Sequence, residues 1–343
     1  MSVKDAGIIN GEVVKEALLE SDGSSVSVLS FGAITKNWTV KFGSKSIPIV
    51  LGFDSLDAYQ ADKNFVGIIA GRVANRTQNG RFKLGTIEYQ LPINDYPNHL
   101  HGGSSGFGKK NWELEFDSKN CAVQLHRVSA HLEQGYPGVV DVTVMVKLHK
   151  NTVTYEMSAI PDRPTPINLA QHNYYNLMGK GNIWGHYFES VAKSYTPMNE
   201  MLIPTGSISD LESYGMKTSR GQWDLSSPKT LAQLDPEGVG IDMNLVFPAE
   251  RNKEIPVAAM TAKNGLKLEI FTDQPGLQFY SGKKLSGNFL GHTGKKYEPF
   301  EGFCLEPQKF PSSLTILTFP SIIFTPENHY KQITSIKVST PLE

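Results

Sequence analysis

Short segments in which hydrophobic and polar residues alternate run through most of the chain. From Ser25 onward the period is two rather than 3.6, as in SVSVLSFGAITKNWTVKF, and each apolar run is only a few residues long. Three pairs of runs are separated by short polar turns, at Gly85 with Thr86, at 117–120 and at Lys150 with Asn151. Each pair predicts an antiparallel hairpin, and the later runs LKLEIFTD, GLQFYSG and SLTILTFPSIIFTPENHYKQITSIKVS continue the pattern.

Helical signals are few and short. The strongest is SSPKTLAQL, with Ser227 as the N-cap and Pro228 in the first helical position, and SLDAYQAD after Ser55 is a second. Neither is long enough to cross over between parallel strands, so a doubly wound α/β sheet is disfavoured. The sequence therefore predicts an all-β fold, a large antiparallel β-sandwich with few short helices. No internal repeat is visible and the proline-rich stretch 161–166 is too short for a linker, so we expect one domain over residues 1–343.

Composition narrows the classes of partner. Lys and Arg number 33 against 34 Asp and Glu, so the formal charge of -1 gives no electrostatic case for a nucleic acid or an anionic membrane surface. Only two cysteines occur, no apolar signal segment follows the N-terminus, and no run of about 18 apolar residues could span a bilayer. We therefore expect a cytoplasmic protein.

Two segments in the first third carry groups suited to binding. GRVANRTQNGRF places Asn75 and Arg76 at a strand end, where an amide and a forked guanidinium suit hydroxyl or carboxylate oxygens. The alternative is a solvated arginine loop. NHLHGG contains His99 and His101, which would share one face of a strand and could form half of a metal site. No further ligands stand at metal-binding spacing, so we expect no metal there, and the two following glycines indicate a turn that something approaches closely.

Two later segments carry titratable groups in apolar surroundings. PINLAQHNYYNL sets His172 and Tyr174 among amides and aromatic rings, a mixture that suits carbohydrate because rings stack on sugar C–H groups while amides bond hydroxyls. GFCLEPQKFP places Glu306 after an apolar run, where burial would raise its pKa toward that of a useful base. A structural histidine and an ion-paired carboxylate are the respective alternatives. Asp242 and Gln278 are isolated polar residues in apolar segments.

Taken together, these segments resemble the aldose 1-epimerase family, also called galactose mutarotases. The motifs occur in the family's order: GRVANR, LHGG with GFGKKNW behind it, QHNYYNL, IPTG, GIDMNLVF, GLQFYSG, CLEPQKFP and FTPENHY. The resemblance implies a single mutarotase-type β-sandwich that interconverts the α and β anomers of a free hexose without metal or cofactor. The resemblance implies that the binding partner is a free hexose substrate. We expect the protein to be a monomer or a weak dimer.

The resemblance also implies roles for individual residues. His172 corresponds to the family's catalytic acid, Glu306 to its catalytic base and His101 to a second active-site histidine. The sugar-contacting positions are matched by Asn75, Arg76, Tyr174, Asp242 and Gln278. We expect the carboxylate of Glu306 to keep the imidazolium of His172 populated near neutral pH. Of the 34 aromatic residues, most should pack the core, with Tyr174 and Phe279 near the ligand.

The chain departs from the family pattern at three places, and rival functions stay open. Tyr175 stands where Phe is usual, Asn199 where Asp is common, and Met243 where a His often follows the aspartate. These departures bear on sugar preference rather than on reaction type. The alternatives are a hexose-phosphate epimerase, which would need more cations than Arg72, Arg76 and Arg81, a glycosidase with Asp242 as second carboxylate, and a non-catalytic sugar-binding protein.

Overall fold

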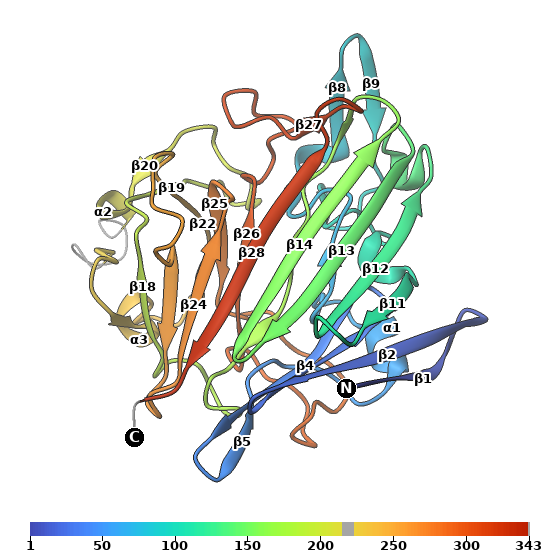
Figure 1. Ribbon diagram of the computed structural model, residues 1–343. Helices are drawn as coiled ribbons and strands as arrows, with labels where there is room; N and C mark the ends of the chain where they lie inside the picture. Colours follow the sequence, from blue (N-terminus) through green and yellow to red (C-terminus); the bar gives the residue numbers. More distant parts are fainter. Residues whose placement is uncertain (215–222, 342–343) are drawn as a thin grey trace.

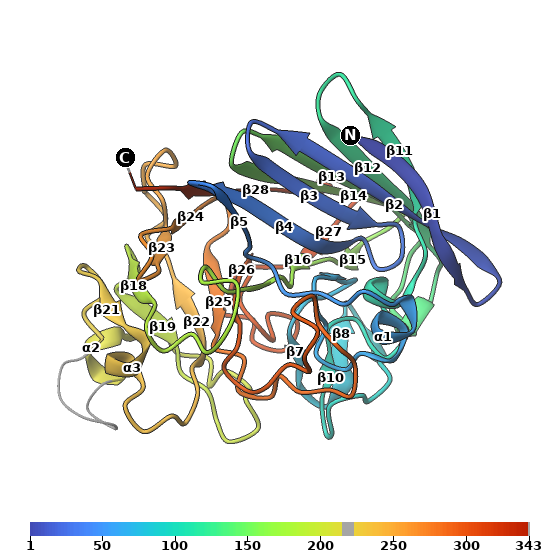
Figure 2. The same cartoon turned by 90° about the horizontal axis from the view of Figure 1, so that it is seen from below.

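The computed structural model describes residues 1–214 and 223–341, which form two layers of antiparallel sheet (Figure 1). One layer is a nine-stranded sheet, and the other consists of a five-stranded and a six-stranded sheet that pack against its two halves (Figure 2). The prediction of an all-β antiparallel sandwich with few short helices is confirmed. No helix within the described ranges is long and apolar enough to cross a membrane.

Each of the three large sheets has its own order of strands in space. The nine-stranded sheet contains β11 (Glu113–Asp117), β12 (Ala122–Ser129), β13 (Val140–His149), β14 (Thr152–Pro161), β28 (Tyr330–Ser339), β24 (Lys267–Thr272), β23 (Ala258–Thr261), β18 (Tyr187–Ser190) and β21 (Lys229–Thr230). The five-stranded sheet contains β1 (Ser2–Ile9), β2 (Glu12–Ser21), β3 (Ser24–Leu29), β4 (Ile34–Phe42) and β5 (Lys45–Pro48). The six-stranded sheet contains β17 (Tyr174–Tyr175), β26 (Phe303–Gln308), β25 (Gly276–Tyr280), β22 (Asp242–Val246), β19 (Ser194–Thr196) and β20 (Ser209–Asp210).

Smaller elements connect and cover these sheets. The two-stranded pairs are β6 (Ile69–Ala70) with β16 (Ala170–Gln171), β7 (Arg76–Thr77) with β10 (His99–Leu100), β8 (Arg81–Leu84) with β9 (Ile87–Gln90), and β15 (Thr165–Pro166) with β27 (Ile323–Phe324). The helices are α1 (Leu56–Ala61), α2 (Leu211–Tyr214) and α3 (Leu231–Leu234), with 3₁₀ turns at η1 (Gln78–Gly80), η2 (Phe107–Lys109) and η3 (Glu133–Gly135).

The three hairpins predicted from alternation are present. β8 pairs with β9 through Leu84 and Ile87, which leaves Gly85 and Thr86 as the turn, and β11 pairs with β12. β13 pairs with β14 along its whole length, and Lys150 takes a positive φ of 51° in the turn between them. These turns could be predicted because each lies between two segments in which hydrophobic and polar residues alternate.

One of the two predicted helices begins elsewhere, and one predicted strand run is absent. The helix expected after Ser55 is present as α1; Ser55 is its N-cap, and its hydroxyl accepts a hydrogen bond from Ala58 N at 3.1 Å. The prediction that Ser227 caps the next helix is wrong: α3 begins at Leu231, because Thr230 and Gln233 form a reciprocal capping box. Residues 228–230 cannot be helical since Lys229 pairs with Phe188 in the sheet. Residues 313–319, expected to be strand, form turns after Ser312 at a φ of 57°.

Strand alternation separates a core face from an outer face in the six-stranded sheet. Leu277 and Phe279 of β25 point inward, and Phe279 packs on Phe188 of β18 with ring centroids 4.5 Å apart. Successive side chains on a strand face opposite ways, so Gln278 and Tyr280 point outward. The expectation that Phe279 lies near the ligand is therefore wrong. The outer face of β25 and its neighbours instead supplies the floor of a pocket.

Candidate active site

The eight residues singled out from the sequence border one pocket of about 160 Å³ on the outer face of the six-stranded sheet. They come from the floor strands β17, β22, β25 and β26, from the β7–β10 ribbon beside the floor, and from the segment after β16. In Figure 2 that ribbon lies on the side of β26 away from the nine-stranded sheet. The residues are His101, His172, Glu306, Asn75, Arg76, Tyr174, Asp242 and Gln278.

The floor of the pocket is set by strand register. Glu306 of β26 lies directly across from Gln278 of β25, and Tyr280 of β25 lies across from Asp242 of β22. Cross-strand partners share one face of a sheet, so residues distant in sequence are brought together by pairing alone. Gln278 Nε2 donates to Asp242 Oδ1 at 2.5 Å, which fixes the Gln278 amide beside Glu306.

His101 is held in one tautomer by the backbone of the facing segment. Asn75 takes a positive φ of 62°, and its N–H donates to Nδ1 of His101 at 3.3 Å. A nitrogen that accepts a hydrogen bond carries no proton, so the proton of the neutral ring lies on Nε2. Burial, together with the positive charge that His172 and Arg76 can carry, lowers the pKa of His101 well below its usual value. His101 is therefore a neutral hydrogen-bond donor at neutral pH.

Arg76 enters the pocket from the same ribbon and is paired with a carboxylate. Its Nε donates to Asp95 Oδ2 at 2.7 Å, and the Arg76 side chain is only 10% exposed. Arg76 O accepts from the backbone N–H of Ser312 at 3.0 Å and from its hydroxyl at 2.8 Å. Asp95 thus holds the guanidinium, Ser312 holds the backbone of Arg76, and Arg76 borders the same pocket as Asp242 and Glu306.

Gly102 joins the His101 loop to the segment that carries Asn75 and Arg76. Gly102 has a φ of 83°, and a Cβ added there would overlap the carbonyl oxygen of Gly71. The close approach expected at the two glycines is therefore made by the protein's own backbone. Only glycine satisfies both the positive φ and the contact.

Gly102→Ala should destabilise the protein by more than about 2 kcal/mol, because it combines a strained φ with a backbone overlap. Urea unfolding measures the change. Gly85→Ala is the matched control, since Gly85 has a φ of 62° but no atom within 4 Å of an added Cβ. Equal destabilisation by the two substitutions would show that the Gly71 contact contributes nothing.

His172 and Glu306 form the titratable centre of the pocket. His172 Nε2 lies 3.7 Å from Glu306 Oε1, with both side chains at most 5% exposed. The imidazole is edge-on to His101 at a centroid distance of 5.0 Å and packs beside Phe65 and Tyr174. Glu306 Oε2 has no hydrogen-bond partner among the described residues. A buried oxygen of this kind is ready to accept a hydrogen bond from a ligand.

Burial moves both groups of this pair toward their uncharged forms. It lowers the pKa of His172 to about 4. It raises the pKa of Glu306 well above its usual value, and the carboxylate of Asp242 adds to that rise. The expectation that Glu306 keeps the imidazolium populated is therefore wrong, because desolvation outweighs the attraction. Both shifts favour a neutral imidazole and a protonated carboxyl over the ion pair.

Glu306→Gln should make the protein more stable than the wild type at alkaline pH. The folded protein holds the Glu306 proton more tightly than the unfolded chain, so wild-type stability falls as pH rises from about 4.3 through the raised pKa. Glutamine carries no such proton, and each unit of pKa shift corresponds to about 1.4 kcal/mol. Urea unfolding at pH 4 and pH 8 should show an advantage that grows with pH. Glu88→Gln, on the exposed face of β9, is the control; a pH-independent difference for Glu306→Gln would contradict the argument.

Several other residues named from the sequence have structural partners outside the pocket. His99 bonds Pro92 O at 2.7 Å and the Tyr136 hydroxyl at 2.8 Å, so it does not act with His101. The Tyr175 hydroxyl accepts from Asn173 Nδ2 and donates to Gln171 Oε1. Asn199 accepts from the N–H groups of its own turn, and Met243 is buried on the opposite face from Asp242. The departures from the family pattern therefore lie behind or beside the pocket.

The pocket also contains residues that sequence reasoning missed. Lys63, Phe65, Asp95, Tyr280 and Lys284 complete much of its wall. Tyr280 could have been found, because it stands two residues after Gln278 on the same strand and must share its face. Phe65 takes a positive φ of 60°, and Asp95 is placed by its pairing with Arg76. Nothing in the local sequence indicates either.

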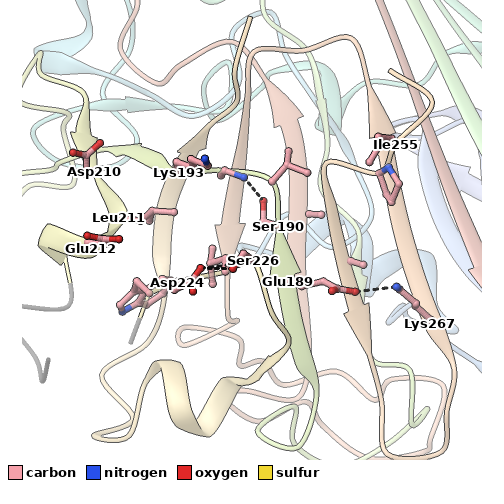
Figure 3. Close-up of a pocket in the computed structure, with 17 residues that line it drawn as sticks. Glu189, Ser190, Lys193, Asp210, Leu211, Glu212, Asp224, Ser226, Ile255 and Lys267 are labelled. Carbon is pink, nitrogen blue, oxygen red and sulfur yellow. Dashed lines mark hydrogen bonds and ion pairs between the residues drawn. The ribbon is translucent and has the colours of Figure 1, made fainter. Parts of the chain in front are cut away.

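A larger cavity of about 860 Å³ lies elsewhere, lined by residues of β18, β20, β23 and α2 and the segments beside them (Figure 3). Glu189 is paired there with Lys267 at 2.9 Å, and the described lining includes neither histidine nor cysteine. Residues 215–222, which stand in the sequence between the lining residues Glu212 and Trp223, lie outside the described ranges. Size therefore does not identify the reactive site, whereas the buried His172 and Glu306 pair does.

Comparison with known proteins finds relatives that match almost the whole chain. The family model described as aldose 1-epimerase matches residues 15–337. A galactose mutarotase of Mus musculus is 36% identical over 334 residues, covering 96% of this chain and 95% of that protein. The chain belongs to the aldose 1-epimerase family. An aldose 1-epimerase of Escherichia coli K12, 30% identical over 311 residues and 86% of each chain, is a more distant relative in the same family.

Solved structures of aldose 1-epimerase relatives share the fold. An aldose epimerase homologue from C. elegans superposes with a TM-score of 0.87 at 25% identity, covering 95% of this chain and 99% of that one. A galactose 1-epimerase from Lactobacillus acidophilus gives a TM-score of 0.84 at 23% identity and covers 98% of both chains. The two-layered β architecture is therefore that of the family.

Proposed function

We propose that the protein is an aldose 1-epimerase that interconverts the α and β anomers of free hexoses such as galactose and glucose. The observation that carries the proposal is a buried acid–base pair, His172 and Glu306, 3.7 Å apart at the end of a pocket lined by amides, a guanidinium and aromatic rings. The family relatives named galactose mutarotase and aldose 1-epimerase support it. The pocket draws on residues from Asn75 to Glu306, which also supports a single domain.

The reaction requires two proton transfers on a hemiacetal. Glu306 accepts the proton of the C1 hydroxyl while His172 donates a proton to the ring oxygen O5, and the C1–O5 bond breaks to give the open-chain aldehyde. Rotation about C1–C2 presents the other face of the aldehyde. Closure then returns one proton from Glu306 to the C1 oxygen and one from O5 to His172. Each transfer by a positioned group contributes about 10²- to 10⁴-fold to the rate.

A proton transfer within the pair prepares it for this reaction. Transfer from the Glu306 carboxyl to His172 Nε2, which lies 3.7 Å from Oε1, creates the carboxylate and imidazolium that catalysis needs. A C1 hydroxyl that donates to Glu306 Oε2, the oxygen without a partner among the described residues, favours the carboxylate form. Sugar binding thus prepares the base and the acid together.

The remaining pocket residues hold the sugar and stabilise charge. The Nε2–H of His101 and the guanidinium of Arg76 are donors for oxygens that gain negative charge as the ring opens. Asp242 and Gln278 accept from and donate to hydroxyl groups, while the ring of Tyr174 offers an apolar face to sugar C–H groups. Asn75, directly before β7, contributes a further amide to the lining.

A hexose-phosphate substrate is less well supported. The Arg72 guanidinium is buried and donates to Pro137 O and Ser129 Oγ, away from the pocket. Arg81 Nε donates to Gln90 Oε1 on the exposed β8–β9 hairpin. Of these three arginines, only Arg76 borders the pocket, and it is paired with Asp95. Lys63 and Lys284 are the other cations of the pocket wall.

Polarimetry tests the proposed function. Freshly dissolved α-D-galactose or α-D-glucose should reach its equilibrium rotation many times faster with the protein than in buffer. Decay no faster than in buffer would overturn the proposal in favour of a binding protein. A nitrophenyl glycoside serves as the second arm, because release of nitrophenol would instead indicate a glycosidase.

A further inference from the structure

A thiol that the proposed reaction does not use lies beside the acid–base pair. Cys304 stands two residues before Glu306 on β26, so their side chains share the outer face of the strand. Its Sγ lies 3.7 Å from Nδ1 of His172, and the residue is fully buried. One ligand atom each from His172, Cys304 and Glu306 lie within 4.8 Å of one another.

These three groups are a ligand set for zinc. Zinc binds thiolate sulfur at about 2.3 Å, imidazole nitrogen at about 2.0 Å and carboxylate oxygen at about 2.0 to 2.2 Å in a tetrahedron, which requires ligand separations of roughly 3.3 to 3.7 Å. The Sγ to Nδ1 distance of 3.7 Å already meets that requirement. The remaining separations lie within 4.8 Å, so the ligand triangle must close by up to about an ångström around the ion.

A second observation points to a ligand at this place. Glu306 is 1% exposed, and its Oε2 has no hydrogen-bond partner among the described residues. A buried carboxylate oxygen without a donor is costly, and a cation satisfies it as well as a hydroxyl does. The pocket that reaches Glu306 and His172 provides the route of entry.

We propose that His172, Cys304 and Glu306 bind a zinc ion, and that zinc bound there excludes the sugar and stops anomerisation. The inhibition rests on the proposed function, whereas the binding itself does not. The metal would take the carboxylate oxygen that acts as base, and it would hold the imidazole of the acid through Nδ1, the nitrogen that faces Cys304. On binding, the thiol of Cys304 loses its proton to solvent as the zinc–sulfur bond forms. Three protein ligands leave a fourth position for water.

The donor set also predicts selectivity. Magnesium and calcium prefer six or more oxygen ligands, and the three residues supply a single carboxylate. Thiolate and imidazole favour zinc among abundant divalent ions without redox chemistry. Millimolar magnesium should therefore leave the mutarotation rate unchanged when micromolar zinc lowers it.

Calorimetric titration with zinc chloride in a thiol-free buffer, beside polarimetry on the same samples, tests the proposal. The wild type should bind one zinc ion, galactose should weaken that binding, and EDTA should restore activity. Cys304→Ser should weaken zinc binding by at least about tenfold, and the inhibition of its mutarotation by zinc is measured relative to its own rate without zinc. Cys121→Ser removes the other thiol, which lies outside the pocket, and should bind zinc like the wild type.

The outcomes separate the metal site from the enzyme activity. Absence of zinc binding at millimolar concentration, or equal binding by Cys304→Ser and the wild type, would overturn the site. Binding that is lost in Cys304→Ser but is indifferent to galactose would overturn the exclusion of sugar. An inactive protein that still binds zinc through Cys304 would reject the proposed function while supporting the site. Circular dichroism of each variant excludes misfolding as the cause of lost binding.

Discussion

Glu306→Gln should lower the rate of hexose anomerisation by about 10²- to 10⁴-fold while changing sugar affinity only a few-fold. Glutamine keeps the shape of the side chain and can still hydrogen-bond the C1 hydroxyl, but it cannot accept that proton. The loss should therefore appear in kcat rather than in KM, because the interaction removed is one made in the transition state. Polarimetry at saturating sugar measures the rate, and calorimetric titration with galactose measures affinity.

The same variant separates catalysis from folding in a second way. A buried carboxyl whose pKa is raised lowers the stability of the folded protein at neutral pH. A Glu306→Gln variant that is less active but more stable than the wild type would therefore indicate that Glu306 serves function rather than folding. A Glu306→Gln protein with near-wild-type anomerisation would overturn the assignment of Glu306 as the base.

His172→Asn should produce a loss of similar size. Asparagine can still hydrogen-bond O5, yet it cannot protonate the leaving ring oxygen, so the C1–O5 bond must break without an acid. His186→Asn is the matched control. His186 is equally buried, and burial also lowers its pKa to about 4, but its nitrogens contact Ile183 O and Leu177 N outside the pocket.

The two histidine variants separate the effect of losing a buried imidazole from the effect of losing the proposed acid. His186→Asn should lose stability but keep its activity per folded molecule, whereas His172→Asn should fold and lose activity. Equal activity of the two variants, measured by polarimetry at matched concentrations of folded protein, would show that His172 is not the acid.

The fold was predictable from the sequence where information is local. Hairpins such as β13–β14 follow from alternation on both sides of a polar turn. The start of α3 was missed because the choice between Ser227 and Thr230 depends on the pairing of Lys229 with β18, a contact between distant segments. Turns at 313–319 were mistaken for strand because apolar β-branched residues also cover a core from irregular backbone.

In the pocket, too, local signals could be predicted from the sequence, whereas features set by distant contacts could not. Residues such as His172 and Glu306 stand out because a polar group interrupts an apolar run, and the structure brings all eight named residues to one place. Their charge states could not be read from the chain, since burial, which sets the pKa of His172, is a property of the folded surroundings. Asp95 and Lys63 look like ordinary surface residues in sequence and reach the pocket only through loop paths.

The position of β28 has a consequence for synthesis of the protein on the ribosome. β28 lies between β14 and β24 and pairs with both, so it joins the two halves of the nine-stranded sheet. β14 ends at Pro161, whereas β28 begins only at Tyr330, and until it emerges both neighbouring strands expose unpaired edges. A nascent chain is therefore open to aggregation from the synthesis of β14 until β28 emerges. A stop codon after Glu306 but before Tyr330 should yield insoluble protein although every pocket residue is present.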